Sequence, residues 1–367
     1  MRWLAAAAVG VTLLVPAAAQ AIHYAPVDQP GPPLSLPQDK LDASLACSGN
    51  PSTGPTPILL VHGTAESPKT EFSWNWEPAL TGLGIPWCAV ALPDNGMDDA
   101  QVAGEYVVNG IRTLHTGAGR RIDVIGHSQG GMLPRWGFRF WPDTRSMVDD
   151  LVGLSPSNHG TLTAVPVCAV VCPASFHQQA AGSQFLAALN SSRETFAGIS
   201  YTTVYTHTDW VVTPNLDDTG SSSLHTGDGQ IRNVAIQQVC PLDVNEHLGV
   251  GTYDPVAWAL ALDAIVHGGP ADPARIPASV CTQLLMPGVN PATFATDEAS
   301  LAAAVASAIA AAPQIPAEPP LACYVTASCP ASGSVESAGA SAPTTKKCKK
   351  GKHRKHGKCV KKGKKRR

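Results

Sequence analysis

The sequence predicts an α/β fold with a mostly parallel central sheet flanked by helices, and three observations support this prediction. Several short runs are apolar throughout, which is typical of strands buried on both faces of a parallel sheet. Segments with a helical apolar stripe lie between these runs. The segment 121–131 joins a strand pattern, a tight glycine-bounded turn and the start of a helix pattern. At 367 residues and 44% hydrophobic, the chain can bury one large core with extra segments at its ends.

Strand and helix patterns alternate along the middle of the chain. The apolar or β-branched runs predicted as strands are 57–61, 87–92, 121–126, 151–154, 199–206 and 231–239. The helix patterns cover 99–115, 132–138 and 254–267, and the first of these repeats apolar residues at positions 103, 107, 111 and 114. These elements predict a single large domain at residues 57–311.

The N-terminal end has the pattern of a secretory signal peptide, predicted at residues 1–21. Met1-Arg2 precedes an apolar run from Trp3 to Val15 and a group of small residues. This run is too short for a membrane-spanning helix, which needs about 20 residues, and we find no later stretch that is long and apolar enough. The sequence therefore predicts a secreted protein, with a Pro-rich extended arm at residues 22–56.

The C-terminal end is predicted to be a Pro-, Ala- and Ser-rich linker at residues 312–345, followed by a basic tail at residues 346–367. The tail holds 14 Lys or Arg and no acid. Because the whole chain has 26 basic and 28 acidic residues, the other 345 residues carry a formal net charge of −16. The tail is expected either to bind an anionic cell-wall or membrane surface or to act as a solubilising end. We expect no nucleic-acid partner for an exported chain.

Ten cysteines agree with export, because disulfides form in oxidising compartments. Spacing favours pairs of neighbouring cysteines, although sequence alone leaves the connectivity open. The favoured pairs are Cys47–Cys88, Cys168–Cys172, Cys240–Cys281, Cys323–Cys329 and Cys348–Cys359. A metal site is the competing explanation, and the absence of any C-x-x-C pair disfavours it.

The segment Gly126-His127-Ser128-Gln129-Gly130 carries the strongest signal for chemistry. It places a serine between two glycines, at a sharp turn that leaves no room for Cβ atoms and exposes the hydroxyl above the sheet edge. A serine hydroxyl becomes a good nucleophile only when a base accepts its proton and an acid orients that base. Ser128 is therefore the candidate nucleophile.

The acid and the base should follow Ser128 in that order along the chain. Asp209 lies just after the predicted strand at 199–206 and is the preferred acid. Asp217 and Asp218 are alternatives, but they lie in a Thr-, Gly- and Ser-rich loop that favours solvation.

His247 lies in a loop after the last predicted strand and is the preferred base. His225 precedes that strand and His267 ends a predicted helix, so both fit less well. Acyl transfer also needs hydrogen-bond donors for the developing oxyanion. The backbone N–H of Gln129 is one candidate, and Thr64, which follows the run 57–61, is the other. A simple turn at Gly63-Thr64 is the alternative interpretation.

Together these residues resemble the Candida antarctica lipase B type of α/β-hydrolase, from Leu41 to the region of Cys323. The matching segments are 57–61 with Gly63-Thr64, Trp74-Asn75-Trp76, Asn109-Gly110-Ile111, Ser128-Gln129-Gly130-Gly131, Tyr205 with Asp209, and the His247 loop. The spacings of Cys47–Cys88 and Cys240–Cys281 are similar to those of that family's disulfides. The resemblance implies an α/β-hydrolase fold and a serine lipase or esterase without a cofactor or metal. It implies Ser128, Asp209 and His247 as the triad and Thr64 and Gln129 as oxyanion donors.

The sequence departs from this family's pattern at three places. His127 stands where the family has a Trp that lines the alcohol-side pocket, so alcohol specificity does not carry over. Ser157 replaces an acid, and Trp74 replaces a serine. The segment Val165–Cys172 is predicted to lie over the site as a lid-like insertion.

The sequence thus predicts a secreted hydrolase that cleaves carboxylic esters, above all lipid esters such as triacylglycerol, through an acyl-enzyme on Ser128. A polyester depolymerase and an envelope-lipid acyltransferase are alternatives, because water and alcohols compete for the same acyl-enzyme. An inactive hydrolase-fold protein that binds surfaces through its tail is the non-enzyme alternative. A complete candidate triad argues against it, since a binding protein need not keep one.

Overall fold

The computed structural model describes residues 22–329, 352–355 and 358–361. Residues 22–329 belong to one compact unit, and the short strands β8 (Lys352–Lys355) and β9 (Lys358–Lys361) form an antiparallel pair in a second. The predicted signal peptide, the predicted linker from residue 330 onward, most of the basic tail, and Cys348 of the predicted Cys348–Cys359 pair lie outside the described residues.

A seven-stranded sheet runs through the body, in the spatial order β1-β3-β2-β4-β5-β6-β7. Six strands are parallel, and only the edge strand β1 pairs antiparallel, with β3. The strands are β1 (Leu45–Ser48), β2 (Ile58–Val61), β3 (Trp87–Val90), β4 (Ile122–His127), β5 (Val148–Leu154), β6 (Ser200–Tyr205) and β7 (Gln230–Ala235). The expected mostly parallel sheet is confirmed.

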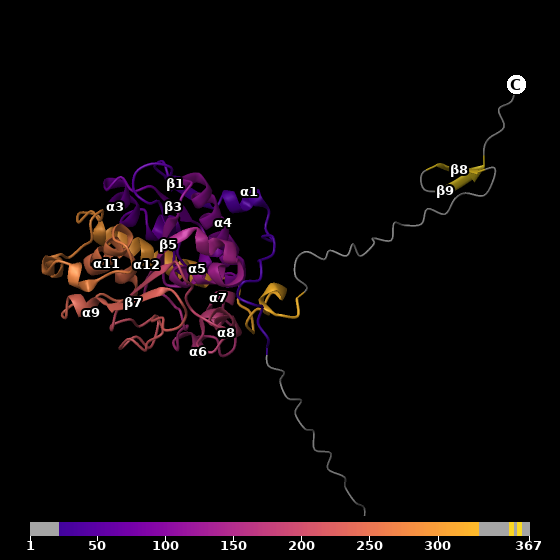
Figure 1. The fold of residues 1–367 in the computed structure, drawn as a ribbon. Helices are drawn as coiled ribbons and strands as arrows, with labels where there is room; N and C mark the ends of the chain where they lie inside the picture. Colours follow the sequence, from indigo (N-terminus) through magenta and orange to yellow (C-terminus); the bar gives the residue numbers. More distant parts are fainter. Residues whose placement is uncertain (1–21, 330–351, 356–357, 362–367) are drawn as a thin grey trace, which may run out of the picture. The chain divides into compact units, whose positions relative to one another are not determined.

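Helices surround the sheet (Figure 1). The longer ones are α4 (Ala100–Ala118), α5 (Gln129–Phe140), α11 (Pro255–Val266) and α12 (Phe294–Ala311). The shorter ones are α1 (Gln38–Asp42), α2 (Pro68–Glu71), α3 (Trp76–Gly82), α6 (Ala164–Val167), α7 (Ala174–Gln179), α8 (Gln184–Leu189), α9 (Ile236–Val239) and α10 (His247–Thr252).

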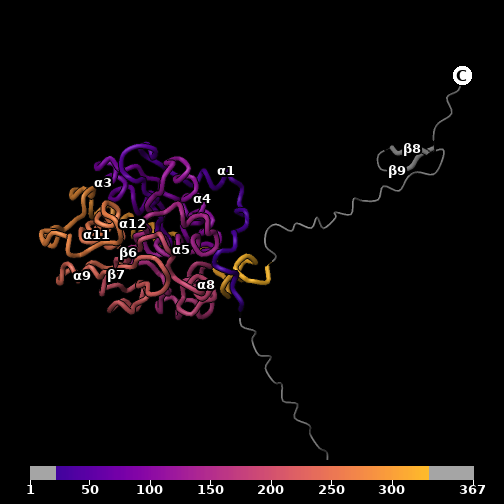
Figure 2. The backbone as a smooth tube through the Cα atoms, viewed as in Figure 1, coloured from indigo at the N-terminus to yellow at the C-terminus, as the bar shows by residue number. Residues whose placement is uncertain are grey.

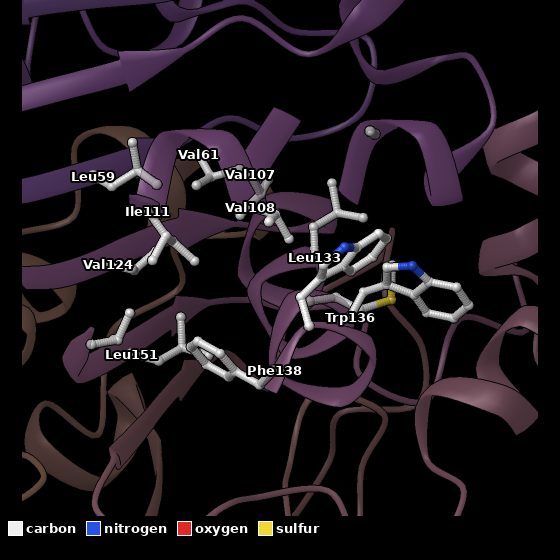
Figure 3. Close-up of a cluster of buried hydrophobic side chains, with 14 of the residues drawn as sticks. Leu59, Val61, Val107, Val108, Ile111, Val124, Leu133, Trp136, Phe138 and Leu151 are labelled. Carbon is white, nitrogen blue, oxygen red and sulfur yellow. The ribbon is translucent and has the colours of Figure 1, made fainter. Parts of the chain in front are cut away.

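Two buried clusters pack on opposite faces of the sheet, because successive side chains of a strand point to opposite sides. On one face Leu59 and Val61 of β2 pack with residues of α4 and α5 (Figure 3). On the other face Ile58 and Leu60 of the same strand pack with residues of α3 and α11. All four side chains are completely buried. The apolar run 57–61 therefore supplies both layers of the core, as expected for an inner strand.

Helix α4 begins and ends where its sequence dictates. The Asp99 side chain accepts a hydrogen bond from Gln101 N at the N-terminus. At the C-terminus Gly119 adopts the left-handed conformation, with φ of 65°. Buried residues of this helix include the predicted stripe positions 103, 107, 111 and 114.

Both terminal segments of the body are more ordered than the sequence indicates. The predicted extended arm forms β1, and Tyr24 pairs with Thr326 in a β-bridge. The Ala25 N–H donates to the Val325 carbonyl at 2.9 Å. Figure 2 shows the first and last described segments of the body side by side. The body thus extends about 18 residues past the predicted boundary at residue 311, because this segment supplies buried side chains.

Tyr324 gives the physical reason for this difference. Its ring centroid lies 4.9 Å from that of Trp141 and 5.7 Å from that of Phe140, and its hydroxyl accepts a hydrogen bond from Trp136 Nε1 at 3.1 Å. A single aromatic residue in a Pro- and Ala-rich segment forms no periodic pattern, so the sequence does not predict that Tyr324 packs on the body.

Two other expectations need correction. The run 231–239 forms strand β7 and then helix α9, rather than one strand. Helix α12 has a mean hydropathy of 1.2 over 18 residues, so by length and composition a later stretch does reach the level of a membrane-spanning helix. Its residues Val305 and Ile309 instead line a cavity of the body, described below.

The eight cysteines between residues 22 and 329 form four disulfides. They join Cys47 to Cys88, Cys168 to Cys172, Cys240 to Cys281, and Cys323 to Cys329. Each of these four pairs matches the pairing favoured by the spacing of the cysteines.

Candidate active site

Ser128 lies at the turn between strand β4 and helix α5, in a backbone conformation that few residues adopt. Its φ is 52° and its ψ is −122°. Neighbouring backbones approach so closely that a Cβ on Gly126 would lie 2.1 Å from the Gly130 carbonyl oxygen, and a Cβ on Gly130 would lie 2.1 Å from the Val61 carbonyl oxygen. The two glycines of the motif are therefore required for the turn that presents Ser128.

Asp209 and His247 are brought together from segments 38 residues apart in the sequence. His247 Nδ1 lies 2.9 Å from Asp209 Oδ2. The other carboxylate oxygen of Asp209 accepts the backbone N–H groups of Val211 at 2.9 Å and Val212 at 2.8 Å. With the carboxylate fixed in this way, the proton of a neutral His247 is held on Nδ1, and Nε2 is left free to accept a proton.

The same contacts keep Asp209 ionised. Burial raises the pKa of this carboxyl group, but the charge of His247 and the hydrogen bonds from His247, Val212 and Val211 outweigh it and hold the pKa below the ordinary value. His247 itself is the first residue of α10, where the Glu246 side chain accepts hydrogen bonds from Leu248 N and Gly249 N. The cap fixes the start of the helix, and with it the position of the His247 ring.

The two candidate oxyanion donors lie beside Ser128. Gln129 is the first residue of α5, so its N–H has no partner within the helix. Thr64 lies directly after β2, and its Oγ1 accepts a hydrogen bond from Gln179 Nε2 at 2.8 Å. The amide oxygen of Gln179 accepts the Ser157 hydroxyl at 2.9 Å. Because the Thr64 oxygen already accepts, its own O–H remains free to donate to an oxyanion.

A cavity of about 260 Å³ connects these groups. Ser128, His247 and Thr64 line it, and most of the other lining side chains are apolar. They include Ala65, Ala164, Val167, Phe176, Trp210, Val211, Val212, Leu248, Val305 and Ile309. An apolar cavity with a few polar groups is typical of sites that bind small apolar molecules.

The segment predicted as a lid borders this cavity. Ala164 and Val167 of α6 are among the lining residues, and the Cys168–Cys172 disulfide follows directly. Val170 is 78% exposed and Val167 is 51% exposed. The segment thus presents exposed apolar surface beside the cavity, which is costly to leave in contact with water.

The alternative acid and base residues lie elsewhere. Asp217 is exposed and accepts hydrogen bonds from Thr219. His225 is exposed, and His267 is half exposed and lies next to Asp263. These three residues are not among those that line the cavity.

Two acids at the site were not predicted from the sequence. Glu66 lines the cavity, and Glu71 lies behind it, both in contact with His127. The sequence does show the two acids three and eight residues after Gly63, but their spacing does not indicate that their side chains are buried beside the site. Gln179, which contacts Thr64, was missed for the same reason.

The chain is similar to known lipases over most of its length. It is 36% identical to Lipase B of Pseudozyma antarctica over 304 residues, which cover 80% of this chain and 86% of that protein. The chain belongs to the lipase B family. The family described as Lipase (class 2) also matches residues 111–248, the region that contains Ser128, Asp209 and His247.

The crystal structure of Aspergillus fumigatus lipase B resembles this structure with a TM-score of 0.74 and 30% sequence identity. The match covers 84% of this chain and 76% of that one. As a member of the lipase B family with an α/β-hydrolase fold, the chain is a carboxylic ester hydrolase of the lipase or esterase type. The resemblance seen in the sequence is confirmed.

Proposed function

We propose that the protein cleaves carboxylic esters of lipids through an acyl-enzyme on Ser128. His247 accepts the proton of the Ser128 hydroxyl as it attacks the ester carbonyl, and later returns it to the leaving alcohol. Asp209 holds His247 in the required tautomer. Thr64 and the N–H of Gln129 donate to the oxyanion of the tetrahedral intermediate.

The hydrogen bond of 2.9 Å between Asp209 and His247 is the observation that carries this proposal. It fixes the free nitrogen of His247 in the cavity that Ser128 also lines. Water then attacks the acyl-enzyme with the same base, which completes hydrolysis.

Lipid esters are the substrate class that suits the cavity. Its lining is mainly apolar, and Trp210 at the mouth is 63% exposed. An acyl chain gains about 0.8 kcal/mol for each CH₂ group that leaves water. The exposed apolar side chains of α6 and α12 around the mouth favour contact with a lipid surface, and movement of the segment Val165–Cys172 would widen access.

Secretion and surface binding complete the proposal. Four disulfides fit an extracellular location, and the apolar N-terminal run supplies a signal for export. The 14 cations of residues 346–367 favour attraction to anionic cell walls or membranes. Binding of isolated cell walls and anionic vesicles by the full chain, but not by residues 22–345, would support this role. Equal binding by both, or binding that persists in molar salt, would exclude it.

Replacement of Ser128 by Ala tests the catalytic assignment. The variant should fold normally and lose hydrolysis of p-nitrophenyl esters except for a small residual rate from the oxyanion donors and binding. An organophosphonate should modify the native protein at Ser128 alone. Near-native activity of Ser128→Ala, or modification of another serine, would refute the assignment.

A further inference from the structure

A second group of ionisable side chains lies directly behind the candidate triad. Glu66, Glu71 and His127 are buried, with 2%, 0% and 1% of their surfaces exposed. His127 Nδ1 lies 3.0 Å from Glu71 Oε1 and 3.3 Å from Glu66 Oε2. We call these three residues the His127 cluster. Burying ionisable groups is costly, so a cluster this close to the reaction centre calls for a physical role.

The hydrogen bonds of His127 require it to be positively charged. Its Nδ1 faces carboxyl oxygens of Glu66 and Glu71, and its Nε2 lies 3.1 Å from the backbone carbonyl oxygen of His247. A carbonyl oxygen can only accept, so Nε2 must carry a proton. The ionised Glu66 carboxylate, at 3.3 Å, also only accepts, so Nδ1 carries a proton too. A neutral imidazole protonated only on Nε2 would turn the lone pair of Nδ1 toward the Glu66 carboxylate and leave that contact unsatisfied.

The two carboxyl groups hold one proton between them. One imidazolium balances one carboxylate, and a second buried negative charge would have no partner. The charge and hydrogen bonds of His127 outweigh burial and lower the pKa of Glu66 to about 2, whereas burial and the neighbouring charge of Glu66 raise the pKa of Glu71. The cluster is then neutral overall, with a carboxylate at Glu66 and a carboxylic acid at Glu71.

The other histidines that face the cluster supply no competing hydrogen-bond donor to its carboxyl groups. His62 donates from Nδ1 to the Gly63 carbonyl at 2.8 Å and accepts the Leu92 N–H on Nε2 at 2.9 Å, which makes it neutral. Burial lowers the pKa of His62 to about 4, in agreement with this tautomer. The His247 ring lies against that of His127, with 4.8 Å between centroids and 44° between planes, and its own Nδ1 is hydrogen-bonded to Asp209.

The cluster touches each of the three segments that carry the proposed machinery. The Gly63 N–H, one residue before Thr64, donates to Glu66 Oε2 at 2.9 Å and to Glu71 Oε2 at 2.8 Å. His127 directly precedes Ser128 in the chain. The bond from His127 Nε2 holds the backbone of His247 itself.

Close packing leaves the cluster no freedom to rearrange. A Cβ on Gly251 would lie 2.5 Å from His127 Cδ2, and a Cβ on Gly63 would lie 2.3 Å from Glu66 Oε2. The Gly251 carbonyl is in turn fixed by Trp76 Nε1 at 2.7 Å. The three side chains therefore occupy a fixed space that backbone atoms enclose.

We propose that Glu66, Glu71 and His127 are positioning residues. They hold three segments in one rigid arrangement, namely the loop at Gly63-Thr64, the turn at Ser128 and helix α10. Where the family has an apolar Trp directly before the nucleophile, this chain has His127, which belongs to a neutral hydrogen-bonded network. The inference rests on the proposed roles of Ser128, His247 and Thr64. It differs from a purely structural role because it requires a negative charge at Glu66 and a proton at Glu71.

The kinetic test uses three glutamine variants of the full chain with p-nitrophenyl butyrate. Glu66→Gln removes the carboxylate that balances His127, so kcat should fall at least about 10²-fold, as for a lost oxyanion donor, with little change in KM. Glu71→Gln replaces a neutral acid by a neutral amide and should lose at least about tenfold less. Glu194→Gln is the matched control. Glu194 is a buried carboxylate that lies 2.5 Å from His159 Nε2 and does not line the cavity.

The three variants separate positioning from packing. Glu194→Gln should lower the thermal midpoint while its kcat per folded molecule stays near that of the native protein. Equal kcat losses for Glu66→Gln and Glu71→Gln would refute the assignment of a charge to Glu66 and a proton to Glu71. A Glu66→Gln variant that folds and keeps kcat within about twofold would overturn the positioning role.

The protonation state of His127 is measured separately in Ser128→Ala, which needs no activity. Imidazole ¹⁵N chemical shifts should report two protonated nitrogens on His127 at pH 7, and a neutral ring after Glu66→Gln is added. A neutral His127 at pH 7 would overturn the inference. Because the three side chains offer ligand atoms within 4.8 Å of one another, stoichiometric zinc in the purified protein would also overturn it. Activity that survives Ser128→Ala would instead refute the proposed function and leave the shift measurement intact.

Discussion

Buried acids lie near both ends of strand β4, in opposite electrostatic surroundings. At its end, Glu66 and Glu71 share His127 as a cationic partner. At its start, Asp123 lies beside Asp150 of the neighbouring strand, whose backbone N–H donates to Asp123 Oδ1 at 3.2 Å. Burial and the charges of neighbouring acids raise the pKa of Asp123 to about 7 and that of Asp150 to about 8, and the charges of nearby arginines offset this only in part.

The difference indicates that groups at one end of the parallel strands serve the reaction, whereas groups at the other end affect only stability. The carboxyl ends of parallel strands meet at one edge, where loops bring together residues from distant segments. There the buried charges are compensated and oriented. At the opposite edge arginines compensate the acids only in part, so these acids should affect the pH dependence of folding and leave the reaction unchanged. The following predictions test this separation, from the largest expected effect to the smallest.

Asp209→Asn should produce the largest change, at the catalytic edge. The Asn amide would present N–H groups to His247 Nδ1, which favours the tautomer with its proton on Nε2 and removes the base. We expect kcat to fall about 10⁴-fold, the loss typical of such triads. Steady-state hydrolysis of p-nitrophenyl butyrate measures it.

Asp217→Asn provides the control for this substitution. It changes an exposed acid of the same segment and should leave kcat unchanged. Comparable losses in the two variants would contradict the choice of Asp209 as the acid.

Loss of the Cys47–Cys88 disulfide should be the next largest effect, and it should act on stability alone. The bond joins strands β1 and β3 and closes a separation of 41 residues. Chain entropy gives about 4 kcal/mol for the double Ser variant, against about 2 kcal/mol for Cys168–Cys172, which closes only 4 residues. Urea unfolding measures both. A larger loss of unfolding free energy for the Cys168–Cys172 variant than for the Cys47–Cys88 variant would contradict this order. A fall in kcat for the Cys47–Cys88 variant would show that the β1–β3 pair affects catalysis.

Thr64→Val tests the oxyanion donor at the catalytic edge. The variant keeps the backbone N–H but loses the hydroxyl, so kcat should fall about 10²-fold, or about 2.7 kcal/mol, while KM changes little. Thr64→Ser keeps the hydroxyl and should recover most of the rate. A change confined to KM would place Thr64 in substrate binding instead.

Local sequence rules were sufficient for the six parallel strands of the sheet and for the proposed triad. The Gly-x-Ser-x-Gly turn can form only where two backbones meet closely, so it located Ser128 without further information. Asp209 and His247 followed because acids and bases of such sites lie just after strand ends. Their contact is observed, and their catalytic roles stay predictions.

The His127 cluster could not be predicted, because its geometry depends on tertiary packing. Glu66 and Glu71 reach His127 only because the chain after β2 folds back through helix α2. From the sequence alone, an acid in that segment is expected to be solvated, because the fold of the chain after β2 is not known. The edge strand Leu45–Ser48 was missed for a related reason, since its half-exposed sequence has no clear alternation.

Asp123→Asn is expected to have the smallest effect on the reaction, because it changes an acid at the opposite end of β4 from Ser128. In the folded protein the pKa of Asp123 is raised to about 7 from an ordinary value of 3.8. Because the folded pKa lies above the unfolded one, the stability that the neutral acid provides is complete below about pH 4 and is lost as the pH rises through about 7. The substitution keeps an oxygen that can accept the Asp150 N–H, and it removes the buried charge.

The variant should therefore match the native protein at pH 4 and be more stable at pH 9, by up to about 4 kcal/mol. Urea unfolding at the two pH values measures this difference, and kcat at pH 8 should be equal in both proteins. Asn at a partly exposed acid such as Asp143, which pairs with Arg112, serves as the control and should give no gain at pH 9. A fall in kcat for Asp123→Asn would show that charge at the start of β4 reaches the active site, and the two ends of the strand would then not be independent.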